Sequence, residues 1–174
     1  DFYIRQGQSF NIAAEKSRGV FDWLGFLDGD EYLYIKNQSN VSEFFSQKKF
    51  ENADGIAISW CVYGSNDKVI ANNRLTVTQF TKYNQTPPDA DGFGLVKSFV
   101  RPEKVDLKYT NPHKLNVEEE RYFDENGEGV QWRGTTKKIN WENAKVMHFI
   151  CRSMEHYVSR IKRRVYADLS DSSG

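Results

Sequence analysis

The chain of 174 residues is 39% hydrophobic and 14% aromatic, which gives it enough apolar material for one packed domain and excludes an extended disordered segment. Lysine plus arginine and aspartate plus glutamate number 24 each, and this balance excludes the global positive field that drives nonspecific nucleic-acid binding. No apolar run approaches the roughly 20 residues that span a bilayer, so we expect a cytoplasmic or membrane-peripheral location, with peripheral membrane contact left open.

The first predicted element is a helix from Gln8 to Lys16. Phe10 and Ile12 stand on the face that we expect to pack against the rest of the domain. Gly19 follows the helix and suits its C-terminal turn, because glycine adopts left-handed backbone conformations without steric cost.

A buried strand over Phe21–Leu27 is predicted next, and it ends abruptly in the carboxylates of Asp28, Asp30 and Glu31. Open α/β sheets place ligand sites at the C-terminal ends of such strands. Two aspartates that flank a glycine there can present oxygens to one divalent cation, which in turn bridges the phosphates of a nucleotide. The same three letters are also ordinary turn chemistry, so this interpretation competes with a plain solvated turn.

A second acidic pair, Asp89 and Asp91, follows two prolines within Thr86–Gly94. Prolines and glycines at this density predict a mobile, solvated loop rather than a metal site. Neither acidic stretch continues into the closing glutamate of a calcium-binding EF-hand loop, which disfavours that class of site.

The middle of the chain predicts alternating helices and strands. Val41–Phe50 is predicted to be an amphipathic helix with Val41, Phe44 and Phe45 on its packing face, capped by Asn40 or Ser42. Strands are predicted over Gly55–Tyr63, Leu75–Phe80, Gly94–Pro102 and Ala144–Phe149, and a hairpin with Asn-Gly at its tip over Tyr122–Gly127. Few helices among several strands favour an α/β or α+β class.

The last part of the chain places an exposed histidine, His148, at the end of a strand, with Arg152 and Ser153 directly before a helix from Met154 to Leu169. Ser153 is the expected N-cap, and the free N–H groups of the first helical turn suit a phosphate. The apolar residues at helical spacing are predicted to face the core; they are Met154, Tyr157, Val158, Ile161 and Val165.

Four stretches of the chain, taken together and in order, resemble the family 2-like and family 92-like glycosyltransferases of the GT-A fold. They are Trp23–Leu33, Ile56–Ser65, Lys97–Pro102 and His148–Arg160. The pattern combines an Asp-x-Asp-Glu after a tryptophan-led strand, a tryptophan before a Gly-Ser turn, Lys-Ser-x-x-x-Arg-Pro, and a late His-aromatic-x-x-basic-Ser. The resemblance implies an α/β, GT-A-like architecture, with a Rossmann-like mixed sheet flanked by helices.

The resemblance also implies an activity: transfer of a sugar from a nucleotide-sugar donor to a glycan or other hydroxyl acceptor, assisted by Mn²⁺ or Mg²⁺. The metal ligands it implies are Asp28, Asp30 and His148. The residues it places at the nucleotide sugar are Asp28, Asp30, Lys97, Arg152 and Ser153. Another histidine, His113, is expected to be a loop residue rather than a ligand.

The catalytic base stays open between Glu31, Asp89 and Asp91, because the family often has an acid where Gln79 stands here. The sequence begins at Asp1 and reaches its acidic motif almost at once. We therefore expect residues 1–174 to form a single, N-terminally truncated domain that carries the metal and acceptor half of the fold. Two alternatives remain: another metal-dependent nucleotide-diphosphate enzyme, and a carbohydrate-binding domain with weak or no catalysis.

Overall fold

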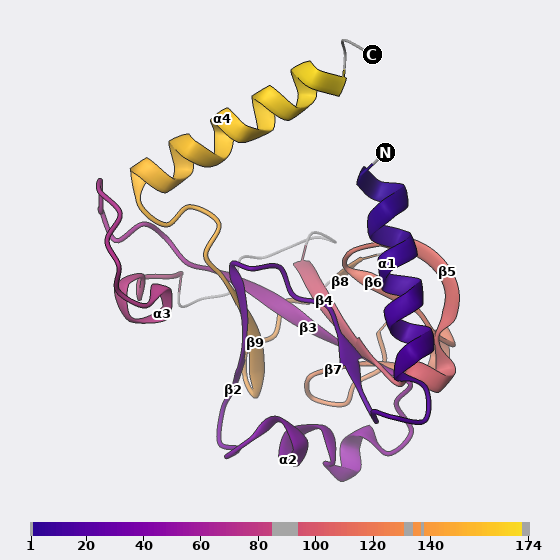
Figure 1. The fold of residues 1–174 in the computed structure, drawn as a ribbon. Coiled ribbons are helices and arrows are strands. Elements are labelled where there is room, and N and C mark those ends of the chain that lie inside the picture. Colours follow the sequence, from indigo (N-terminus) through magenta and orange to yellow (C-terminus); the bar gives the residue numbers. More distant parts are fainter. Residues whose placement is uncertain (1, 85–93, 131–133, 137, 172–174) are drawn as a thin grey trace. The chain divides into compact units, whose positions relative to one another are not determined.

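The computed structural model of the protein describes residues 2–84, 94–130, 134–136 and 138–171 (Figure 1). The chain divides into two compact units. The first consists of Asp1–Trp60 and Thr86–Val146, and the second of Cys61–Gln85 and Met147–Gly174. Each unit is described by itself below.

A mixed seven-stranded sheet forms the framework, with the strand order β1-β4-β3-β9-β2 and with β7 and β8 paired to β3 and β4. Its strands are β1 (Leu24–Gly25), β2 (Glu31–Ile35), β3 (Gly55–Val62), β4 (Gly94–Val100), β7 (Tyr122–Asp124), β8 (Thr135–Thr136) and β9 (Ala144–His148). β4 runs antiparallel to β3 and to β1, while β7 runs parallel to β3. β5 (Asp106–Asn111) and β6 (Lys114–Asn116) form a separate antiparallel pair. This arrangement confirms the predicted mixed sheet with flanking helices.

Alternation along β3 sends buried side chains to both faces of the sheet. Ile56 and Ile58 join one core cluster, to which Phe44, Phe45 and Phe50 contribute from the chain before β3. Ala57 joins a second cluster on the opposite face; its other buried members are Ala14, Val96, Val100, Val105, Leu115 and Tyr122. A strand buried on both faces explains why Gly55–Tyr63 is almost continuously apolar in sequence.

The first helix, α1 (Phe2–Ser17), begins earlier than predicted and packs against β5 and against the short 3₁₀ helix Pro102–Lys104. Gly19 takes a φ of +68° just after the helix, which confirms its role in the C-terminal turn. Phe10 stacks on Phe26 with ring centroids 3.8 Å apart, whereas Ile12 is exposed. The prediction was therefore right for Phe10 and wrong for Ile12.

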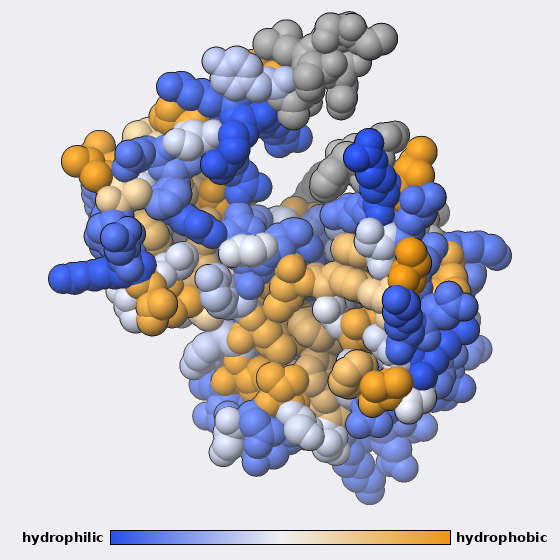
Figure 2. Space-filling view, viewed as in Figure 1, coloured by the Kyte–Doolittle hydropathy of each residue, from blue (hydrophilic) through white to orange (hydrophobic). Residues whose placement is uncertain are grey.

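The predicted buried strand before the acidic motif is much shorter in the structure, because β1 has only two residues at an edge of the sheet. Phe21 and Leu27 are exposed, so the prediction that they lie in the core is wrong. Figure 2 shows that apolar side chains reach the surface of the first unit at several places. The position of β1 explains this exposure. A two-residue strand at the edge of the sheet has a neighbouring strand on one side only, so the residues that flank it are not enclosed.

The second predicted helix is present in part. The predicted helix Val41–Phe50 consists of α2 (Val41–Phe45) and a 3₁₀ turn over Lys48–Phe50, with Val41 exposed rather than packed. Asn40 is its N-cap and accepts a hydrogen bond from the Glu43 N–H, as predicted.

The predicted strand Leu75–Phe80 is wrong, because this segment contains the one-turn helix α3 (Thr76–Gln79). Side-chain hydrogen bonds explain the turn: the Thr78 hydroxyl donates to the Leu75 carbonyl, and the Gln79 amide donates to the Arg74 carbonyl. Local bonds of this kind compete with strand pairing. Between Tyr122 and Gly129, by contrast, the predicted turn is present, with Gly127 at a φ of +86°.

The second unit contains α3 and the long helix α4 (Met154–Asp171). The first turn of α4 is fixed by hydrogen bonds from the Met154 and Glu155 N–H groups to the Lys68 and Val69 carbonyls. The prediction that its apolar stripe faces a core is wrong, since the five stripe residues are 41–56% exposed. Helical periodicity identifies a stripe but does not identify what covers it. None of the helices in the described ranges is long and apolar enough to cross a bilayer.

Gly55 provides a test of packing between β3 and β7. A Cβ at this position would lie 2.7 Å from the Tyr122 Cζ, and the Tyr122 ring is fully buried. We expect Gly55→Ala to lower the free energy of unfolding by about 1–3 kcal/mol through overpacking. Gly129→Ala is the matched control, because nothing lies within 4 Å of its added Cβ, and a change within about 0.5 kcal/mol is expected. Equal effects in urea titrations would contradict this account.

Candidate functional site

The acidic motif forms a tight turn in the first unit. The Glu31 N–H donates to the Asp28 carbonyl over 2.9 Å, and the Glu31 Oε2 accepts the Asp28 N–H over 2.8 Å. These reciprocal bonds hold the turn at the point where β2 begins. The Asp28 side chain remains 56% exposed, whereas the Glu31 side chain is fully buried. The two neighbouring carboxylates therefore differ in their access to a ligand.

Lys97 holds these two carboxylates together from β4. Its Nζ lies 3.0 Å from the Asp28 Oδ2 and 3.1 Å from the Glu31 Oε2, and its side chain is only 1% exposed. Lys97 pairs with Ile58 across the β3–β4 ladder and so projects on the Ile58 face of the sheet. The ion pairs compensate for removing the ammonium from water, and they fix the acidic turn to the sheet.

Burial controls the electrostatics of Glu31. Desolvation raises the pKa of its carboxyl, and the hydrogen bond from the Asp28 N–H and the charge of Lys97 offset part of that rise. Its Oε1 is buried and has no hydrogen-bond partner among the residues that the structure describes. Enclosure of this kind suits a residue that positions Asp28 and Lys97; its assignment as a catalytic base stays a prediction.

His113 is a neighbour of this cluster that sequence reasoning did not connect with it. It lies in the turn between β5 and β6, as its predicted loop position requires. Its Nδ1 bonds to the Val96 carbonyl over 2.9 Å, and its ring meets the Trp60 ring edge-on with centroids 5.0 Å apart. Burial lowers the pKa of His113, and the charge of Lys97 lowers it further. The only sequence signal was the residue type, because the contact with β4 spans 17 positions.

Within the described residues, the acidic turn offers carboxylates but no complete ligand set for a divalent cation. No group of three or more His, Cys, Asp or Glu side chains that could hold a metal ion occurs within the described ranges. Asp28 nevertheless keeps its carboxylate partly exposed, and Asp30, two positions later in the chain, is half-buried. Mg²⁺ is commonly bound through one or two carboxylates with substrate phosphates completing its shell. The donor set is compatible with that arrangement.

The remaining predicted site residues belong to the second unit or lie outside the described residues. His148, Arg152 and Ser153 belong to the second unit, and the prediction that His148 is exposed is wrong, since it is 3% exposed at the end of β9. Ser153 is confirmed as the N-cap of α4, where its hydroxyl accepts the His156 N–H. Arg152 takes a φ of 45° immediately before this cap. Asp89 and Asp91 lie outside the described residues.

The comparisons with known proteins bear on the family. The model of glycosyltransferase family 92 matches residues 2–165. The match defines the class of the protein as glycosyltransferase, in agreement with the sequence motifs. The chain belongs to glycosyltransferase family 92. No curated protein and no solved structure matches it.

The buried ion cluster predicts a strong coupling between Lys97 and Glu31. Lys97→Met leaves a buried carboxylate without its counter-charge, so we expect a loss of about 3–5 kcal/mol in the free energy of unfolding. Lys97→Met combined with Glu31→Gln should lose less than the sum of the single changes, with an interaction energy of about 0.5–3 kcal/mol. The control is Lys82→Met, because the Lys82–Asp67 pair has a similar 3.1 Å distance but is exposed; about 0–1 kcal/mol is expected. Strict additivity in the Lys97 cycle would refute the coupling.

The raised pKa of Glu31 predicts a pH dependence of stability. The folded chain holds the proton of the Glu31 carboxyl more tightly than the unfolded chain does. The stability that this proton contributes is therefore fully present below the ordinary pKa of 4.5, and it is lost as pH rises through the pKa of Glu31 in the folded chain. Wild type should therefore lose stability relative to Glu31→Gln as pH increases above 4.5, until Glu31 is fully ionised. Urea unfolding of both proteins across this pH range measures the difference. A difference that is flat, or that grows in favour of wild type, would contradict the raised pKa.

Proposed function

We propose that this glycosyltransferase moves a sugar from a nucleotide-sugar donor to a hydroxyl of a glycan or similar acceptor, and that it depends on Mn²⁺ or Mg²⁺. The observation that carries the proposal is the Asp28 carboxylate, partly exposed and held in place by buried Lys97 and Glu31. A fixed carboxylate followed two positions later by a second one, Asp30, suits a cation that is also bound by a diphosphate. The family match supports the transfer of a sugar, and the finer assignment rests on the residues.

Charge balance supports a divalent cation at the turn. Asp28, Asp30 and Glu31 bring three carboxylates, and the Lys97 ammonium neutralises one of their charges. The exposed Asp28 carboxylate keeps a negative charge at the surface of the turn that a divalent ion can approach. When bound, such an ion would neutralise the negative charge that develops on the leaving diphosphate. The contribution of Lys97 and Glu31 is to hold the acidic turn in one position before substrate binds.

The other assignments follow from the family resemblance and are part of the proposal. His148 would complete the metal shell, and Arg152 with the Ser153 N–H would contact the diphosphate at the start of α4. The resemblance does not fix the residue that accepts the proton of the acceptor hydroxyl: Glu31, Asp89 and Asp91 are the candidates, and the enclosure of Glu31 by Lys97 favours the two aspartates. The mixed sheet with flanking helices is compatible with the GT-A type of glycosyltransferase fold.

The proposal is tested by donor turnover on the folded chain. With UDP- and GDP-sugars and Mn²⁺, we expect release of nucleoside diphosphate that falls at least about 100-fold in Asp30→Ala, because preorganised charge at the leaving group is lost. Chelator should abolish release, and added Mn²⁺ should restore it. Asp67→Asn is the control, since Asp67 is an exposed carboxylate in the second unit. Circular dichroism shows that each variant folds.

The same experiment separates the alternatives. Turnover that is insensitive to chelator and to Asp30→Ala would overturn the metal-dependent mechanism. Release of nucleoside monophosphate without sugar transfer would favour a different nucleotide-diphosphate chemistry. Glycan binding without turnover, unaffected by chelator or by Asp30→Ala, would favour a carbohydrate-binding domain that has lost catalysis.

A further inference from the structure

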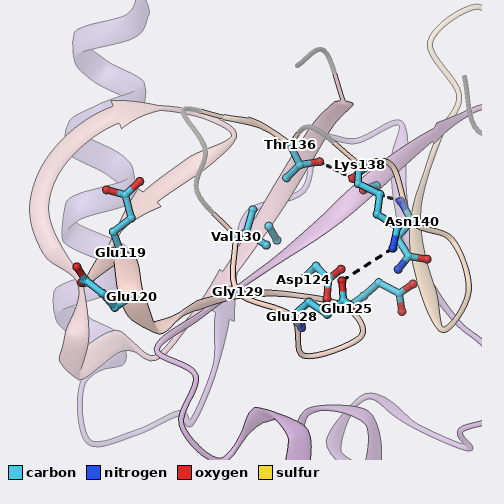
Figure 3. A pocket seen from close by; sticks show the side chains of 12 residues that line it. Glu119, Glu120, Asp124, Glu125, Glu128, Gly129, Val130, Thr136, Lys138 and Asn140 are labelled. Atoms are coloured by element: carbon cyan, nitrogen blue, oxygen red, sulfur yellow. Dashed lines mark hydrogen bonds and ion pairs between the residues drawn. The ribbon is translucent and has the colours of Figure 1, made fainter. Parts of the chain in front are cut away.

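A cavity of about 530 Å³ opens in the first unit, away from the acidic turn. Figure 3 shows Glu119 and Glu120 on one side of it and Lys138 and Asn140 on the other. Five carboxylates line the cavity, with Lys138 as the one lysine among its described lining residues; the carboxylates belong to Glu119, Glu120, Asp124, Glu125 and Glu128. A surface with this charge repels a nucleotide diphosphate and attracts a cation.

The five carboxylates are not equivalent. Glu125 is buried and accepts hydrogen bonds from the backbone N–H groups of residues 142–144, and Asp124 accepts those of Asn126 and Glu128. These two shape the cavity wall. Glu119 and Glu120 are exposed at the rim, and their side chains have no hydrogen-bond or ion-pair partner in the described part of the chain. The rim carboxylates are therefore available to a ligand.

Two buried residues on the cavity wall have unused hydrogen-bonding capacity. Asn140 is only 9% exposed, and its Oδ1 accepts the Glu142 N–H over 3.1 Å. Its amide Nδ2 has no acceptor among the residues that are described. Ser59 is 4% exposed, and within the described ranges its Oγ accepts only the Asn140 N–H, over 3.4 Å. The Asn140 amide can donate, and the Ser59 hydroxyl can donate as well as accept, so both residues suit a ligand that carries oxygens.

We propose that this cavity binds a sugar unit that carries a free amino group. The ammonium of such a ligand matches the rim carboxylates of Glu119 and Glu120. Its hydroxyl groups can accept from the Asn140 amide and exchange hydrogen bonds with Ser59. A neutral sugar would leave the negative field unmatched, and a simple amine would leave the Asn140 amide without a partner. The combination of charges and donors thus selects an amino sugar over either component alone.

The cavity is distinct from the proposed transfer site. Ala57 and Ser59 line it and alternate along β3 with Ile58, which is the ladder partner of Lys97. Successive strand residues point to opposite faces, so the cavity opens on the face opposite Lys97. A sugar held there anchors a glycan without contacting the acidic turn. The inference therefore does not depend on the metal-dependent transfer mechanism, and its test measures binding rather than turnover.

Calorimetric titration of the full chain with glucosamine, glucose and ethanolamine tests the proposal. Glucosamine should bind about tenfold more tightly than glucose or ethanolamine at low salt, and added salt should reduce the advantage over glucose. Equal binding of glucose would overturn the role of the carboxylates. Equal binding of ethanolamine would overturn the role of the sugar hydroxyls, and absence of saturable glucosamine binding at millimolar concentration would overturn the site.

Variants locate the binding. Glu119→Gln with Glu120→Gln keeps the shape of the exposed rim and should weaken glucosamine about three- to tenfold while leaving glucose unchanged. Ser59→Ala should weaken both sugars. Asp28→Asn is the control, because it alters the opposite face and should leave glucosamine binding unchanged. If Asp28→Asn abolished the binding and the rim variant did not, the sugar would be bound at the acidic turn and the cavity assignment would be wrong.

Discussion

The buried Lys97 ammonium is the interaction on which the rest of the site depends. A lysine that is 1% exposed on a sheet face is stable only with compensating charges close by. Asp28 supplies one of them from the connection between β1 and β2, and Glu31 supplies the other from the first position of β2. These two strands lie at opposite ends of the strand order. The segment between these two strands therefore runs along the sheet. The ion pairs of Lys97 hold this segment to β4 at Asp28 and Glu31. The position of the exposed Asp28 carboxylate thus follows from burying a cation beneath it.

Within this cluster, Glu31 and Asp28 have different roles, although they are only three positions apart in the sequence. Glu31 is enclosed by Lys97 and by the Asp28 N–H, so its charge serves the structure. Asp28 shares Lys97 but keeps half of its surface in water, so it can still contact a ligand. Burial rather than residue type makes the distinction, and three adjacent acids in a sequence give no indication of it.

Sequence reasoning identified elements whose signals are local. Asn40 as a cap, Gly19 after the first helix and the apolar β3 are specified by residues within a few positions of one another. It failed in two segments for other reasons: the apolar stripe of α4 is periodic but exposed, and the six residues Leu75–Phe80 are too few for alternation to distinguish a strand from a helical turn. The pairing of Lys97 with Asp28 spans 69 positions, and the association of His113 with β4 is likewise long-range. No local pattern encodes either contact.

The position of Gln79 constrains how the proposed transfer can deprotonate its acceptor. Sequences of the family often have an acid here, whereas this chain has an amide that is 7% exposed and bonded to the Arg74 carbonyl and the Lys68 ammonium. An amide does not accept a proton from a hydroxyl at neutral pH, so the base has to be another residue. Glu31 is surrounded by its own partners, and a base must reach the proton that it removes. The proposed mechanism therefore leaves deprotonation to one of the two aspartates that precede Gly94 in the sequence, Asp89 or Asp91, because neither the amide of Gln79 nor the enclosed Glu31 suits that step.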